Sequence, residues 1–77
     1  MSVRLYKWTQ ISGWPIEAAL KAGELRAICA HPYCDRTASF GRVVDRDMRL
    51  WVIAKRMRCR GCGHLGAQFE VWGRARN

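Results

Sequence analysis

The sequence predicts a small α+β domain in which a metal ion staples two short β-hairpins to a central helix. Three observations lead to this fold class. The chain has 77 residues, and a domain of this size often needs a staple besides its core. Its four cysteines form two close pairs. Apolar residues recur at helical spacing in some segments and at every second position in others.

The N-terminal part, residues 1–23, is expected to form an arm followed by a short helix. The segment VRLYKW (3–8) can be a short strand or an ordered arm. Pro15 suits the first turn of a helix, and Gly23 suits its C-terminal exit. We therefore predict a helix at about 15–22, which covers one side of the core.

The first cysteine pair is expected at the end of a hairpin. Apolar and polar residues alternate in ELRAIC (24–29), which is typical of a strand. The segment HPY (31–33) makes a turn before Cys34, and RTASFGRV (36–43) can return as the partner strand.

A central helix is predicted at about 45–55, with Asp45 as a possible cap. One apolar stripe at helical spacing supports it: Leu50, Ile53, Ala54 and Met57. Other apolar residues lie off this stripe: Met48, Trp51 and Val52. The helix is therefore expected to be sandwiched between the hairpins or buried in a dimer. A strand is the rival interpretation of RLWVIA, because Trp, Val and Ile favour strands.

The second cysteine pair is expected at the turn of another hairpin. From Arg56 onward, Arg56, Arg58 and Arg60 alternate with Met57 and Cys59. This period of two indicates a strand that enters the turn. A second alternating segment, 67–72, provides the return strand, and the last residues, 73–77, are expected to be frayed.

The cysteine spacing, Cys29-x4-Cys34-x24-Cys59-x2-Cys62, suits one tetrahedral ion, because each pair supplies two sulfurs from one tight turn. Gly61 and Gly63 allow the backbone to fold around the metal. Two disulfides or a thiol redox site are the alternatives, and either His31 or His64 can replace one cysteine ligand.

The cysteine pairs, with CRGCG after a strand, resemble the zinc-ribbon class of small zinc fingers. The order of cysteine pair, central helix and hydrophobic-Arg-Cys-x-x-Cys-Gly-His is also similar to small uncharacterised zinc-finger-like proteins of bacteria. This resemblance covers about Leu25 to Trp72 and implies a structural Zn²⁺. We accordingly divide the chain, 1–77, into the N-terminal arm and helix, a zinc-ribbon-like core (24–72) and the frayed tail.

The charge distribution favours a polyanionic partner. The net charge is +8 and the isoelectric point is about 10.2. Residues 36–60 hold eight basic and two acidic residues, a net charge of +6. A basic region of this kind suits nucleic acid first and an acidic protein surface second. A simpler interpretation is that the charge only keeps a small protein soluble.

We expect a non-enzymatic module that binds nucleic acid, DNA or RNA, through arginines whose planar guanidinium suits phosphate. The candidate contacts are Arg42, Arg46, Arg49, Lys55, Arg56, Arg58 and Arg60. Exposed Tyr6, Trp8 or Trp72 could stack on unpaired bases, although core packing is favoured for most of them.

The alternative is a protein-interaction module, either a homodimer or a small inhibitor or adaptor of an acidic partner, because Trp and Arg dominate interface energetics. A closed four-sulfur site has no open coordination position. The sequence also shows no carboxylate pair near a histidine, no nucleophile elbow and no phosphate-binding glycine loop, so no catalysis is expected. With no signal peptide or membrane-spanning run, a reducing cytoplasm is the expected location.

Overall fold

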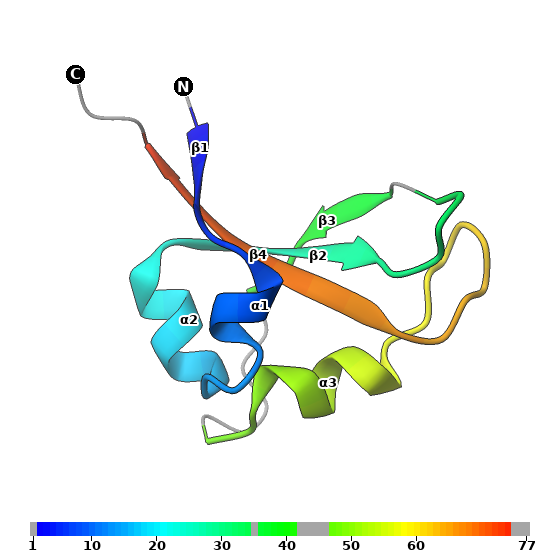
Figure 1. The fold of residues 1–77 in the computed structure, drawn as a ribbon. Coiled ribbons are helices and arrows are strands. Elements are labelled where there is room, and N and C mark those ends of the chain that lie inside the picture. Colours follow the sequence, from blue (N-terminus) through cyan, green and yellow to red (C-terminus); the bar gives the residue numbers. More distant parts are fainter. Residues whose placement is uncertain (1, 35, 42–46, 75–77) are drawn as a thin grey trace.

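The computed structural model describes residues 2–34, 36–41 and 47–74. Its centre is a four-stranded antiparallel sheet with strand order β1-β4-β2-β3. The strands are β1 (Ser2–Tyr6), β2 (Glu24–Cys29), β3 (Thr37–Ser39) and β4 (Ala67–Arg74). The long strand β4 runs through the middle of the molecule (Figure 1).

Three helices in the described part of the chain lie on one side of this sheet (Figure 1). They are α1 (Trp8–Ile11), α2 (Ile16–Ala22) and α3 (Leu50–Arg56). None of these three helices covers the other face of the sheet (Figure 1). The part of the chain described has no helix with the length and apolar character needed to cross a membrane.

The core forms where the alternating side chains of the sheet meet the helices. Leu25 pairs with Val71, and Ala27 pairs with Phe69 in the β2–β4 register. All four side chains are buried, because paired residues of antiparallel strands point to the same face. The helices complete the core with their own buried side chains: Ile11, Ile16, Ala19, Leu50 and Ala54.

Helix α2 confirms the short helix expected at 15–22. Pro15 stands at its N-cap, and the chain leaves it through Gly23. A Cβ atom at Gly23 would collide with the backbone oxygen of Trp72 in β4. Glycine thus lets the chain turn from the helix directly into β2 against its neighbouring strand.

The central helix is shorter than predicted. Its first helical residue is Leu50, because Arg49 has an extended backbone, and the proposed cap, Asp45, lies outside the described residues. The apolar stripe is confirmed: Leu50 and Ala54 are buried, and Ile53 and Met57 pack against the core. The rival strand is wrong for this segment, since the stripe faces the sheet at helical spacing.

The first hairpin is confirmed, but the second differs from the prediction. Strand β3 pairs with β2 over Thr37–Ser39. In contrast, Arg56 is the last residue of α3. Arg58 forms an isolated bridge with Leu65, which lies before β4 and not within it. The alternation of arginines was misleading because β4 pairs with β1 and β2 instead.

The N-terminal segment is a true strand that joins the far end of the chain. Ser2 pairs with Arg74 and Val3 pairs with Gly73. Gly73 and Arg74 therefore belong to β4 and not to a frayed tail. Trp8 is not part of β1 but begins α1, a short helix that the sequence pattern did not indicate.

Candidate metal centre and the adjacent groove

Four cysteines come together at one end of the sheet. Cys29 ends β2 and Cys34 follows in the turn toward β3, while Cys59 and Cys62 lie in the loop between α3 and β4. The four Sγ atoms all lie within 4.8 Å of one another. We call this group the metal centre, because the four cysteines are positioned to bind a metal ion.

The sulfur separations fit a tetrahedral ion. A Zn–S bond of about 2.3 Å places sulfurs at the corners of a tetrahedron with edges of about 3.8 Å. The Sγ atoms of Cys29 and Cys62 are 3.5 Å apart, and those of Cys34 and Cys59 are 3.8 Å apart. Both values are close to the tetrahedral edge and far from a disulfide bond, whose sulfurs are about 2.05 Å apart.

The loop from Cys59 to His64 is a tight turn held by its own backbone. The Cys59 N–H donates to the His64 oxygen and the Gly63 N–H to the Cys59 oxygen, both at 2.9 Å. Gly63 has φ +75°, a left-handed conformation that glycine adopts without steric cost. The Gly61 N–H points at the Cys59 sulfur, at 3.4 Å, as expected for the outer shell of a metal–thiolate site.

The first pair uses a wider turn to bring its sulfurs to the same cluster. The Cys34 N–H donates to the His31 oxygen at 3.1 Å, and the Cys29 N–H donates to the Arg36 oxygen at the same distance. The backbone N–H groups of His31 and Arg36 act to lower the pKa of Cys29 and Cys34, respectively, although the net shift of both thiols is upward. The four intervening residues are thus folded into a compact loop that brings both sulfurs to the cluster.

The environment separates the thiols by acidity. Backbone N–H groups of Cys62 and Gly61 stabilise the thiolate of Cys59 and lower its pKa to about 6. The His31 N–H lowers the pKa of Cys29 as well, but burial and hydrogen bonds with the other cysteines outweigh it and raise this pKa to about 12. Without a metal ion, Cys59 is therefore a thiolate at neutral pH while Cys29 keeps its proton.

The two histidines stand beside the cluster and not in it. Among the described residues, the group able to hold an ion comprises the four cysteines. The rings of His31 and His64 meet edge to face with centroids 5.3 Å apart. His31 Nδ1 accepts a hydrogen bond from the Tyr33 N–H at 3.2 Å. Four sulfurs already complete a tetrahedral set, so neither histidine is needed as a ligand.

A groove of about 550 Å³ opens beside the metal centre, between β2–β3 and the segment 57–60. Its floor consists of small side chains on the inner face of the sheet: Ala27, Ala38 and Ala67. We call these the alanine floor. Phe40 and Met57 add apolar wall. The groove forms because the inner face of the sheet carries small alanine side chains at this end. Farther along β4, the larger side chains of Phe69 and Val71 fill the same face.

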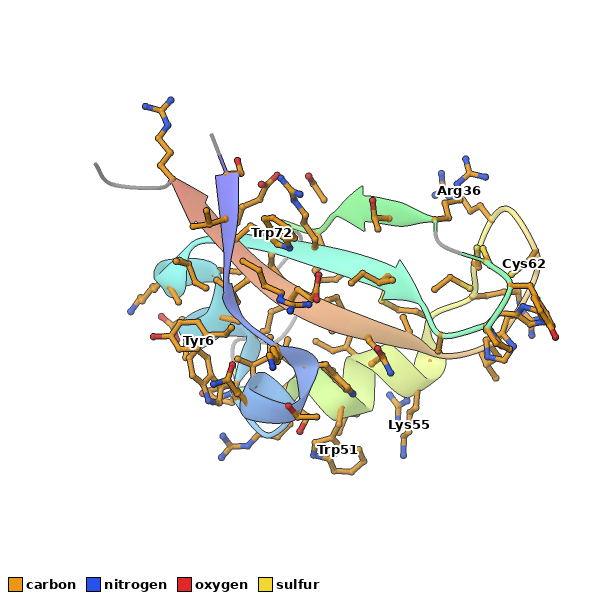
Figure 2. All side chains as sticks on the ribbon, turned by 45° about the horizontal axis from the view of Figure 1, so that its top comes forward. Tyr6, Arg36, Trp51, Lys55, Cys62 and Trp72 are labelled. Carbon is orange, nitrogen blue, oxygen red and sulfur yellow. The ribbon has the colours of Figure 1, made fainter. Side chains whose placement is uncertain are left out.

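Three arginines line this groove, and we call them the arginine rim: Arg36, Arg58 and Arg60. Arg58 donates from Nη1 to the Gly63 oxygen at 2.8 Å, which fixes it against the turn of the metal centre. Arg36 lies beside the loop that carries Cys62 (Figure 2), and a Cβ at Gly61 would lie 2.8 Å from its Nη1. The rim is thus built on the two metal-binding loops.

Of the seven predicted nucleic-acid contacts, Arg58 and Arg60 line the groove. Arg49 is at the opposite end of α3 and donates to the Gly13 oxygen at 3.2 Å. Lys55 projects from α3 away from the sheet, with Trp51 (Figure 2), while Arg56 is exposed at the helix end. The remaining two, Arg42 and Arg46, lie outside the described residues.

Arg36 was missed from the sequence. It follows Cys34 by two residues, whereas Arg58 and Arg60 flank Cys59 directly. The expectation that both cysteine pairs bind one ion could have identified Arg36. Residues next to the ligands of one tetrahedral site must lie near one another, however distant they are along the chain.

The uncovered sheet face carries a nearly neutral polar network that crosses all four strands. Ser39 and Arg26 both bond Glu24, at 2.9 Å each. The Arg26 guanidinium lies 4.5 Å from the centre of the Trp72 ring. Glu70 accepts from the Trp72 indole at 3.2 Å and from an Arg4 nitrogen at 2.7 Å. Glutamates thus balance the arginines here, so the excess of positive charge lies elsewhere.

Most of the candidate stacking aromatics are packed. The rings of Tyr6 and Trp14 lie 4.9 Å apart, and those of Trp8 and Phe69 lie 5.9 Å apart. Trp72 lies under Arg26 on the sheet (Figure 2). This agrees with the expectation that a small domain uses its large rings to fill space.

Comparison of the chain with protein-family models, curated proteins and solved structures finds no match. The fold and the site therefore define the class of protein by themselves. It is a compact α+β module whose four-stranded sheet carries a four-cysteine metal-binding cluster at one end.

Proposed function

We propose that this chain is a non-enzymatic, zinc-ribbon-like module that binds nucleic acid through the arginine-rimmed groove. The observation that carries the proposal is the position of the arginine rim on the two loops of the metal centre. Zinc is the proposed ion because four thiolates in tetrahedral array suit it and leave no open position for catalysis.

The proposed role of zinc is to hold the rim in shape. Arg58 and Arg60 flank one ligand, Cys59, and Arg36 follows another, Cys34. Binding of one ion to both loops fixes the backbone positions of these arginines relative to each other. This lowers the conformational entropy that is lost when they bind the phosphate backbone of a nucleic acid. The planar fork of arginine suits phosphate oxygens.

Charge complementarity supports a polyanion. The glutamates of the described part form ion pairs away from the rim, Glu17 with Lys21, Glu24 with Arg26 and Glu70 with Arg4. These pairs leave the net charge of +8 to be carried by other arginines and lysines. Such a surface attracts nucleic acid largely irrespective of sequence.

The test is the salt dependence of binding by the zinc-loaded protein, followed by fluorescence anisotropy of labelled oligonucleotides. Three rim contacts predict that log K falls against log salt with a slope of about −2 to −3. Arg60→Gln should weaken the slope by about 1, while Lys21→Gln, the same charge change on α2, should leave it unaltered. A flat salt dependence would refute nucleic-acid binding.

A second candidate, a protein-interaction module, is favoured by Trp51. Its side chain is 48% exposed and points away from the sheet together with Lys55, whose ammonium is 5.0 Å from the ring (Figure 2). A half-exposed Trp with a cation beside it suits a homodimer or an acidic partner surface. This surface is separate from the groove, so the two functions are tested by different variants.

A further inference from the structure

We infer that the groove holds one unpaired nucleotide, so that the protein binds single strands in preference to duplexes. This inference rests on the function proposed above and makes it more specific. It follows from three properties of the groove: its size, the apolar side chains of its floor, and the position of the arginine rim.

The groove has the size of a small-ligand site. Its volume of about 550 Å³ falls within the range of about 300–1,000 Å³ that is usual for such sites. A duplex presents its phosphates on a broad convex surface and its bases inside, so a local hollow gains little contact from it. A nucleotide of a single strand can turn its base into the hollow.

The floor suits the face of a base. Ala27 and Ala38 are directly paired across β2 and β3, and Ala67 pairs with Cys29 one step farther along β2. Three methyl groups on one sheet face make the floor apolar, and Met57 and Phe40 also line the groove. An apolar floor of this kind accepts any base, because every base has a π-face.

The rim suits the phosphate of the same nucleotide. Arg36 precedes β3 on one side of the groove, and its side chain reaches Gly61 in the loop after α3, which also carries Arg58 and Arg60. Guanidinium groups can bond phosphate and also stack on bases. Apolar floor and cationic rim together match the two halves of a nucleotide, whereas phosphate contact alone would not need the floor.

The described helices are not suited to recognise a duplex by insertion into its major groove. Within the described residues, α2 and α3 have seven residues each and α1 has four. Each helix packs one side against the sheet. The buried residues are Ile11 in α1, Ile16 and Ala19 in α2, and Leu50 and Ala54 in α3. None of them projects from the domain as a long exposed helix would for insertion into the major groove.

The experiment compares one labelled oligonucleotide, as a single strand and annealed to its complement, with the zinc-loaded protein at the same salt concentration. We expect the single strand to bind roughly tenfold or more tightly, since base stacking adds to the phosphate contacts. Equal affinities would overturn this inference while leaving nucleic-acid binding intact. Binding of neither would overturn both.

A variant that fills the groove without changing charge tests the location. Ala38 lies on an exposed part of β3, so Ala38→Leu should cover the floor and reduce single-strand affinity at least several-fold, with duplex affinity unaltered. The matched control is Ala18→Leu at an exposed position of α2. Unaltered single-strand affinity in Ala38→Leu would exclude the groove.

Zinc stoichiometry and circular dichroism check that the variant folds. If Ala38→Leu loses zinc, Ala38→Val provides a smaller filling with a residue that strands favour, and it should still weaken single-strand binding. Methyl NMR gives an independent readout in the unmodified protein. Ring currents of a bound base should shift the Ala38 and Ala67 methyl signals but not that of Ala18, and unmoved floor signals would overturn the inference.

Discussion

Replacing Gly63 by alanine isolates the contribution of backbone conformation to the metal centre. Gly63 has φ +75° and has nothing within 4 Å of the position where a Cβ would stand. A side chain there meets no neighbour, so the penalty comes from the left-handed backbone alone. That penalty is about 1–2 kcal/mol for a residue with a Cβ.

The penalty should appear as weaker metal binding, because the turn at Gly63 presents the Cys59 and Cys62 sulfurs to the ion. About 1–2 kcal/mol corresponds to a loss of roughly 5- to 30-fold in zinc affinity. Competition with a chromophoric chelator measures this affinity directly. Gly63→Asn should lose less than Gly63→Ala, since asparagine tolerates the left-handed region better.

Gly13 provides the matched control. A Cβ at Gly13 would also meet nothing within 4 Å, but its φ lies outside the left-handed region. Gly13→Ala should therefore leave zinc affinity unaltered. If Gly63→Ala binds zinc as tightly as Gly13→Ala does, the left-handed backbone at Gly63 does not contribute to metal binding.

Two further predictions concern acidity and oligomeric state. The pKa of Cys29 is about 12, so zinc must displace the proton of this thiol at any pH from 6 to 9. The pKa of Cys59 is about 6, so zinc must displace the proton of Cys59 only near and below pH 6. Zinc affinity should thus fall as pH falls and fall more steeply below about pH 6; chelator competition across this range measures it, and a constant affinity contradicts it. The protein-interaction alternative predicts a dimer that Trp51→Glu dissociates in sedimentation velocity, whereas a monomer before and after the change excludes the homodimer.

The local features of the metal centre were accessible from sequence. A Cys-x-x-Cys turn with Gly63 after it needs only neighbouring residues to form, and its hydrogen bonds run between Cys59 and His64. Helix α2 and the β2–β3 hairpin are local in the same sense, with Pro15 and Gly23 marking the ends of the helix. Short-range features of this kind can be predicted from residue type and spacing.

The second hairpin shows where such signals fail. The alternation from Arg56 to Arg60 resembles a strand, yet α3 continues to Arg56. Strand β4 pairs instead with β1 and β2, and Ser2–Tyr6 is separated from it by most of the chain. No local pattern encodes which of several strands will pair, because that choice depends on which arrangement buries the largest common apolar face.

The sequence by itself determined the four cysteines that cluster, the glycine turn beside them and the excess of positive charge. Only the tertiary structure decided which charges share a surface. It brought Arg36 to the groove with Arg58 and Arg60, moved Lys55 and Arg49 away from it, and neutralised Arg4 and Arg26 on the open sheet face. The physical reason is that a hollow or a charged rim is a relation between segments distant along the chain, which the sheet and the metal centre join.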